Sequence, residues 1–134
     1  MNDLSWLGGF CDADGYITLS KDGSRYQPKV GFTNTNATMI TNVCRILDAN
    51  CVKYFKHVRD GAKDNHKPIW KVVVEGKKNC SLFIPLLLPH LVGKRDQANI
   101  VLEWSLGKRR TVFSNRDTEL ISSVRALNKR GLGR

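Results

Sequence analysis

Apolar and polar residues follow one period before Gly15 and another after it. Through residues 4–11 the apolar positions recur at spacings of three and four, which predicts a short helix ending at Gly15. Apolar and polar residues then alternate over 15–20, as in a half-buried strand, and Asp22-Gly23 supplies the turn of a hairpin. This part of the chain is therefore predicted to form a helix and two antiparallel strands.

The two strands of this hairpin each have one apolar and one polar side. Ile17 and Leu19 alternate with polar residues in the first strand, and Val30 and Phe32 do so in the second. The hairpin is therefore predicted to bury one face and expose the other. The exposed, polar face contains Thr18, Ser20, Gln27, Lys29, Thr33 and Thr35.

The same kinds of pattern continue along the chain. Asn36 can cap a second helix that continues to about Ala49. A second hairpin follows, with strands at about 52–59 and 69–75 and a polar, basic connection between them. Three more helices are predicted: one capped by Asn79, one over residues 94–105, and one opened by Ser114 or Asn115.

The order of these elements predicts an α+β fold of the type αββαββα, with an antiparallel sheet covered by helices on one face. We expect a single domain over 1–134, with a core at about 4–105 and a basic helical segment at about 106–134. The uncovered face of the sheet would also carry side chains from the second hairpin. These are Lys71 and some of Lys56, His57 and Arg59.

The charge of the chain suggests what this face is for. Among 134 residues, 22 Lys and Arg exceed 12 Asp and Glu, which gives a formal net charge of +10. A polar face on an antiparallel sheet is commonly just solvated, but so large a basic excess favours nucleic acid as the partner. Polar side chains on such a face can enter the major groove. We expect phosphate contacts from Lys108, Arg109 and Arg110.

Several classes of protein are not favoured. The longest apolar stretch, 82–88, is interrupted by Pro85 and is far shorter than the ~20 residues of a membrane span. Since no secretory signal is visible, we expect an intracellular protein, in an organelle or a prokaryotic cytoplasm. The four cysteines form no C-x-x-C pair and are interpreted as reduced core residues. No pattern calls for an organic cofactor, and the HNH, GIY-YIG and PD-(D/E)xK nuclease signatures are absent or incomplete.

Two acids stand where helix stability does not favour them. Asp12 and Asp14 fall at the C-terminal end of the first helix, where the macrodipole is negative and a carboxylate costs several tenths of a kcal/mol. Asp12 could bind local backbone groups in a turn. For Asp14, a carboxylate beside helix-end carbonyls and the phosphates of a bound nucleic acid is a set of ligands that suits Mg²⁺.

The segment Leu7–Gly15 resembles the LAGLIDADG motif of homing endonucleases. The departures from the motif, Gly8, Phe10 and Cys11, keep its small or apolar character, and the order of the following elements extends the resemblance over roughly 4–105. Six of nine positions match, namely Leu7, Gly9, Asp12, Ala13, Asp14 and Gly15.

The resemblance implies a metal-dependent enzyme built from two copies of the chain. In that family the last acid of the motif binds metal, which here is Asp14 with the carbonyl of Ala13 as a further ligand. Mg²⁺ is the expected ion, and Mn²⁺ is expected to substitute for it. Because only one motif is present, the resemblance implies a homodimer on a pseudo-palindromic double-stranded DNA site. The residues expected at the dimer interface are Leu4, Leu7, Gly8 and Cys11.

The family pattern also assigns two other catalytic positions. Asn36 matches a polar residue, often Gln, that orders water near the scissile phosphate, and capping of the second helix is an equally good explanation for it. Lys94, before Gln97-Ala-Asn99, matches a lysine that stabilises charge during the reaction. The implied activity is cleavage of both DNA strands with 3′ overhangs, in intron or intein homing. The alternative is a relative that binds nucleic acid without cutting it, as an intron RNA maturase or a transcription regulator.

Overall fold

The computed structural model describes residues 3–59, 67–107 and 114–132. Its elements follow the predicted order, which confirms the α+β fold class and the αββαββα core. They are α1 (Asp3–Asp14), β1 (Gly15–Asp22), β2 (Arg25–Asn34), α2 (Ala37–Ala49), β3 (Phe55–Arg59), β4 (Ile69–Glu75), α3 (Lys77–Leu87), the 3₁₀ turn η1 (Leu88–His90), α4 (Arg95–Leu106) and α5 (Asn115–Leu132).

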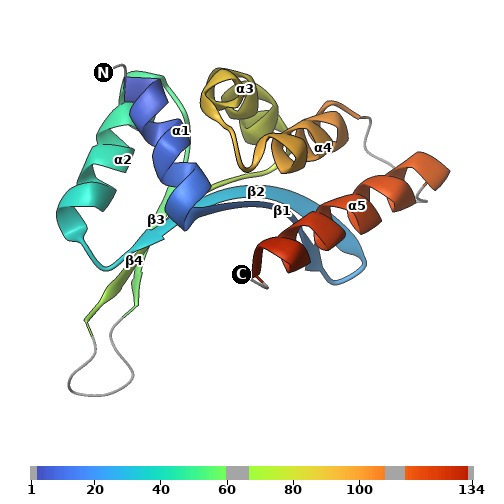
Figure 1. The fold of residues 1–134 in the computed structure, drawn as a ribbon, viewed down its shortest axis with the longest axis horizontal. Helices are drawn as coiled ribbons and strands as arrows, with labels where there is room; N and C mark the ends of the chain where they lie inside the picture. Colours follow the sequence, from blue (N-terminus) through green and yellow to red (C-terminus); the bar gives the residue numbers. More distant parts are fainter. Residues whose placement is uncertain (1–2, 60–66, 108–113, 133–134) are drawn as a thin grey trace.

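The described strands form one antiparallel sheet in the order β1-β2-β4-β3. Figure 1 shows helices α1 to α4 gathered over one side of this curved sheet, while the β3–β4 hairpin projects beyond them. The core lies between these two layers and includes Leu7, Phe32, Ile40 and Phe83, each at most 1% exposed. Of the helices in the described ranges, none is both long and apolar enough to span a bilayer.

The starts of α2 and α5 are set by capping residues that the sequence predicts. Asn36 caps α2 as predicted, because its Oδ1 accepts hydrogen bonds from the backbone N–H groups of Thr38 and Met39 at 3.0 and 3.2 Å. Ser114 and Asp117 exchange side-chain and backbone hydrogen bonds in a capping box at the start of α5.

Two predicted boundaries are wrong. The third helix starts after Gly76, whose positive φ of 94° suits glycine, and Asn79 does not cap it. Instead Asn79 lies inside the helix and its amide donates to the carbonyl of Glu75. Strand β3 starts at Phe55, three residues later than predicted, because Val52 belongs to the turn that follows α2 and its N–H is bonded to the carbonyl of Leu47.

The last helix covers an edge of the sheet. Because β1 is the outermost strand on its side, it has backbone groups that no neighbouring strand can pair. Helix α5 packs against β1 and α4 and buries Leu120 and Val124, and the amide of Asn128 donates to the carbonyl of Ile17 at 3.1 Å. The segment after 106 is thus part of the folded domain over 114–132, while the predicted connection 60–67 lies largely outside the described residues.

Candidate functional site

Helix α1 ends in an exposed carboxylate that is held by a neighbouring strand. Asp14 is the last residue of α1 and is exposed, as is Ala13 before it. The carbonyl of Ala13 has no partner within the helix, because a helix leaves its last four carbonyls unpaired. The amide of Asn34, at the end of β2, donates to Asp14 Oδ2 at 3.2 Å. The end of α1 therefore presents a carboxylate and a helix-end carbonyl together.

Asp12 has a different task. Its Oδ2 accepts the backbone N–H of Val92 at 2.8 Å, and its Oδ1 accepts that of Lys94 at 3.0 Å. These partners lie about eighty residues away along the chain, so the predicted local turn is wrong. Both carboxylate oxygens of Asp12 are used in fixing α1 to the segment that leads into α4.

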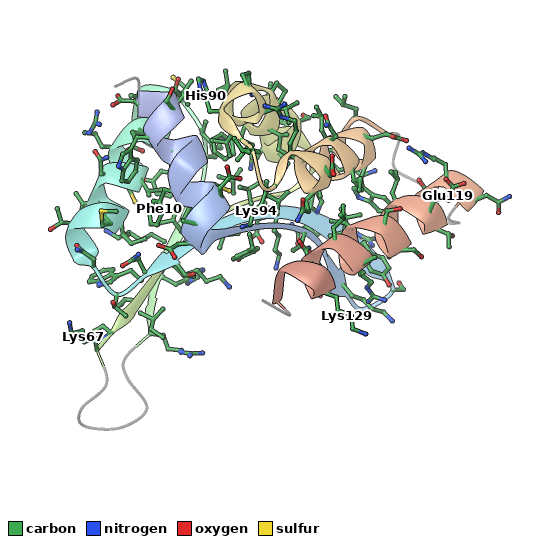
Figure 2. The ribbon with its side chains drawn as sticks, viewed as in Figure 1. Phe10, Lys67, His90, Lys94, Glu119 and Lys129 are labelled. Atoms are coloured by element: carbon green, nitrogen blue, oxygen red, sulfur yellow. The ribbon has the colours of Figure 1, made fainter. Side chains whose placement is uncertain are left out.

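This connection brings Lys94 to the end of α1. Its Nζ donates to the backbone carbonyl of Asp12 at 2.8 Å, and Figure 2 shows Lys94 beside the C-terminal part of that helix. A cation is favoured there because the macrodipole places partial negative charge on the last carbonyls. Lys94 and Asp14, predicted separately from the sequence, are thus positioned by the same helix end.

Replacing Asp12 by alanine should loosen this site without removing any predicted metal ligand. We expect the free energy of unfolding to fall by about 1 to 3 kcal/mol, because two N–H groups lose a charged acceptor. Urea denaturation of Asp12→Ala measures this. Asp96→Ala, which removes an exposed acid from the first turn of α4, is the matched control and should cost well under half as much. Equal losses in the two variants would contradict the role given to Asp12.

The end of α1 supplies only some of the ligands that a divalent metal ion needs. No three His, Cys, Asp or Glu side chains gather to hold an ion within 3–59, 67–107 and 114–132. Cys11 does not contribute, because burial raises the pKa of its thiol to about 12 and a metal requires the thiolate. Mg²⁺, however, is usually bound by one or two carboxylates together with substrate phosphates and water. Asp14 and the carbonyl of Ala13 fit that mode.

The other predicted catalytic residue, Asn36, comes two residues after Asn34, whose amide contacts Asp14. Its side chain caps α2, so the capping explanation is confirmed, and its backbone N–H donates to Asn34 Oδ1 at 2.8 Å. Sequence reasoning missed Asn34. The register pairs Asn34 with Trp70, so its side chain leaves the sheet on the helix-covered face. Strict alternation from Phe32 would have placed Asn34 there.

The uncovered face of the sheet, here called the open face, carries most of the predicted DNA-binding residues. The register pairs Thr18 with Lys29, Ser20 with Gln27 and Thr33 with Lys71, and directly paired residues share a face. Arg59 and His57 are on this face as well, through their pairing with Ile69 and Lys71. Thr35 is exposed just after β2 ends, and Lys108, Arg109 and Arg110 lie outside the described residues.

Lys56 is not on the open face. It pairs with Val72, which is fully buried under the helices, and its ammonium lies over the ring of Trp70 at 5.2 Å from the centroid. The prediction that some of Lys56, His57 and Arg59 lie on the open face is thus correct for the last two and wrong for the first. A strand that starts at Phe55 alternates from there, and pairing with β4 fixes which side each residue faces.

The open face also has an aromatic ring and a carboxylate that the sequence prediction did not include. Tyr16 lies across β2 at Gly31, where any Cβ would overlap its ring. Lys71 lies over the same ring at 5.6 Å from the centroid. Burial raises the pKa of the Tyr16 hydroxyl, opposed by the nearby Lys29, and Lys29 is paired with Glu75 at 3.7 Å. The alternation in β1 already placed Tyr16 on this face.

The predicted dimer residues face the protein's own core. Leu7 and Cys11 are fully buried within the chain, and Leu4 packs against the same core. At Gly8 a Cβ would lie 2.5 Å from the carbonyl oxygen of His90, so this glycine admits η1 rather than another molecule. The prediction that Leu7, Gly8 and Cys11 contact a second copy is therefore wrong. The exposed small residues of α1 are Gly9 and Ala13.

Known proteins resemble this chain weakly in sequence. No family model matches the chain. The uncharacterized protein MJ0314 of Methanocaldococcus jannaschii is 33% identical over 51 residues, which are 38% of this chain and only 19% of the length of that relative.

Solved structures match over nearly the whole chain. The homing endonuclease I-CvuI, in complex with the I-CreI target and Mg, has a TM-score of 0.57 at 21% identity and covers 90% of this chain and 93% of that one. I-CvuI with its own target and Ca gives 0.57 at 20% identity, covering 93% and 94%. The LAGLIDADG meganuclease I-AabMI bound to uncleaved DNA gives 0.59 at 19% identity, covering 98% of this chain and 41% of that one. The fold is that of these endonucleases.

Proposed function

We propose that this protein is a site-specific endonuclease that cuts both strands of a DNA duplex with a divalent metal ion, as a homodimer on a pseudo-palindromic site. The observation that carries this proposal is the exposed carboxylate of Asp14 at an open helix end, with Lys94 held against the same end. An acid in this position lowers helix stability slightly, so a role in binding metal accounts for it better than a structural role does.

The described residues can divide the work of phosphodiester hydrolysis. Asp14 and the carbonyl of Ala13 would hold Mg²⁺, or Mn²⁺ in its place, beside a phosphate of the target. When bound, such an ion polarises the phosphate and lowers the pKa of its water. Lys94 places a positive charge near the negative charge that develops on the phosphate. Asn36 is the residue proposed to order water near the scissile phosphate, with its side-chain oxygen held at the cap of α2.

The homodimer is proposed through a different face of α1 from the one the sequence suggested. Because this chain covers 41% of I-AabMI, the length of that protein accommodates two such units. A Cβ added at Gly9 would meet no atom within 4 Å, and Ala13 lies one turn further along the same helix face. Small residues one turn apart let two helices approach closely. We therefore assign the contact between copies to Gly9 and Ala13, which would bring the two copies of Asp14 together.

The open face is proposed to lie in the major groove, where its donors and acceptors can distinguish base pairs. Lys71→Ala should lower the slope of log affinity against log salt by about 0.9 for each phosphate that is no longer neutralised, and by about twice that in a dimer. Fluorescence anisotropy with a labelled duplex at several salt concentrations measures the slope. The control is Lys78→Ala, at an exposed position on α3, which covers the opposite face of the sheet. Equal slopes for the two variants would contradict this placement.

Cleavage itself is tested with a library of DNA duplexes. The protein is incubated with the library and Mg²⁺, and the ends of any cut molecules are sequenced. The proposal expects cuts at one related set of sites, with short 3′ overhangs and a two-fold symmetric sequence pattern. Enrichment of bound duplexes without cutting would instead support a regulator, and selective binding of structured RNA would support a maturase. Comparison of the cut site with intron and intein insertion sites would then identify the homing context.

A further inference from the structure

Asn34 connects the proposed metal ligand to the start of α2. Its Nδ2 donates to Asp14 Oδ2 at 3.2 Å, and its Oδ1 accepts the backbone N–H of Asn36 at 2.8 Å. A single amide therefore joins the end of α1 to the residue that caps the next helix. The sequence resemblance assigns no role to this position. The turn that leads into α2 explains the bond to Asn36 but not the bond to Asp14.

The two partners fix the orientation of the amide. A backbone N–H can only donate, so the atom facing Asn36 must be the oxygen of the Asn34 side chain. An ionised carboxylate can only accept, so the atom facing Asp14 must be the nitrogen. A flipped amide would place oxygen against oxygen and N–H against N–H, losing both bonds. Asn34 thus offers Asp14 a donor whose position is set by the backbone of the strand end.

We propose that Asn34 is a positioning residue for metal binding, which holds one oxygen of Asp14 so that the other faces the ion. The inference rests on the proposed function, because it refines how that site is built. Asp14 is exposed, so its carboxylate would otherwise sample several rotamers. Hydrogen bonds from neighbouring residues to a ligating carboxylate restrict it, and losing such a bond typically lowers metal affinity or activity about 10- to 100-fold.

A purely structural role predicts a different outcome. Asn34 could serve only to form the turn that leads into α2, through its bond to the Asn36 N–H. Serine separates the two roles, because its hydroxyl can accept from an N–H two residues further on but is too short to donate to Asp14 as well. Alanine loses both bonds. Asn34→Ser and Asn34→Ala should therefore behave alike if the bond to Asp14 matters, and unlike if only the turn matters.

The experiment measures the Mg²⁺ dependence of single-turnover cleavage for the wild type and both variants. We expect the Mg²⁺ concentration for half-maximal rate to rise about 10- to 100-fold in both. The affinity for the duplex in Ca²⁺ should change less than about threefold, since the side chains of the open face are unchanged in both variants. Wild-type metal dependence in Asn34→Ser would overturn the inference, whatever Asn34→Ala does.

A second readout separates this inference from the proposed function. The affinity of the protein–DNA complex for Mn²⁺ is measured by electron paramagnetic resonance, which requires no cleavage. Weaker Mn²⁺ binding in both variants supports the role of Asn34 even if the wild type binds DNA without cutting it, in which case only the proposed activity fails. Unchanged Mn²⁺ affinity in both variants overturns the inference even if the wild type cuts.

Discussion

Asp14→Asn is expected to abolish cleavage in Mg²⁺ while leaving binding of the target site largely intact. The substitution keeps the shape of the side chain and removes the charge that would hold the ion. Losing several kcal/mol of charge stabilisation in the transition state corresponds to about 10³-fold or more in rate. Binding is expected to persist because the proposed DNA contacts come from the side chains of the open face, which this substitution leaves unchanged.

Single-turnover cleavage and anisotropy on the same duplex measure the two effects. Asp48→Asn, at an exposed position near the end of α2, removes the same charge away from the open face and should cut at the wild-type rate. Cleavage retained by Asp14→Asn would remove the basis of the proposed active site. A matching loss of DNA affinity would mean that Asp14 serves the fold rather than the chemistry.

Gly8→Ala is expected to destabilise the fold, whereas Gly9→Ala is not. The Cβ added at position 8 meets the backbone of His90, which cannot rotate away, and overpacking of this kind costs about 1 to 3 kcal/mol. At position 9 the added methyl meets nothing within the chain, and alanine favours the helix by up to about 1 kcal/mol. Urea denaturation at two protein concentrations measures both. A stable Gly8→Ala would contradict the close packing of α1 on η1.

The same pair of positions tests the proposed dimer. Gly9→Leu places a bulky side chain on the exposed side of α1, and sedimentation should then show a shift from dimer to monomer with the fold retained. Leu102→Ala, at a partly buried position on α4 that packs against the core, controls for a general loss of stability. An unchanged dimer in Gly9→Leu would place the contact between copies elsewhere.

The sequence predicted most of the elements because their signals are local. Asn36 caps α2 through its own neighbours, and alternation in β1 and β2 assigned the two faces of the sheet without reference to other strands. The sequence could not place Lys56, because the face of the sheet on which its side chain lies depends on the pairing of β3 with β4. Spacing within α1 correctly identified an apolar stripe. It could not say whether Leu7 and Cys11 face the chain's own core or another molecule, since either satisfies the same periodicity.

The candidate site was predicted in part for the same reason. Asp14 and Lys94 stand out by position in a motif, and the structure brings both to the end of α1. Asp12 and Asn34 act through partners that no spacing reveals, because the backbone N–H groups of Val92 and Lys94 and the carboxylate of Asp14 come from other elements.

Because α5 covers the edge of β1, that edge is exposed while the chain is being synthesised. The bond between Asn128 and Ile17 spans 111 residues, so the outer edge of the first strand stays uncovered until nearly all of the described chain has been synthesised. An exposed strand edge can pair with another chain, and domains begin to fold while synthesis is still under way. Expression of chains shortened before α5 should therefore yield aggregates through β1, and co-synthesis of α5 as a separate peptide should reduce them.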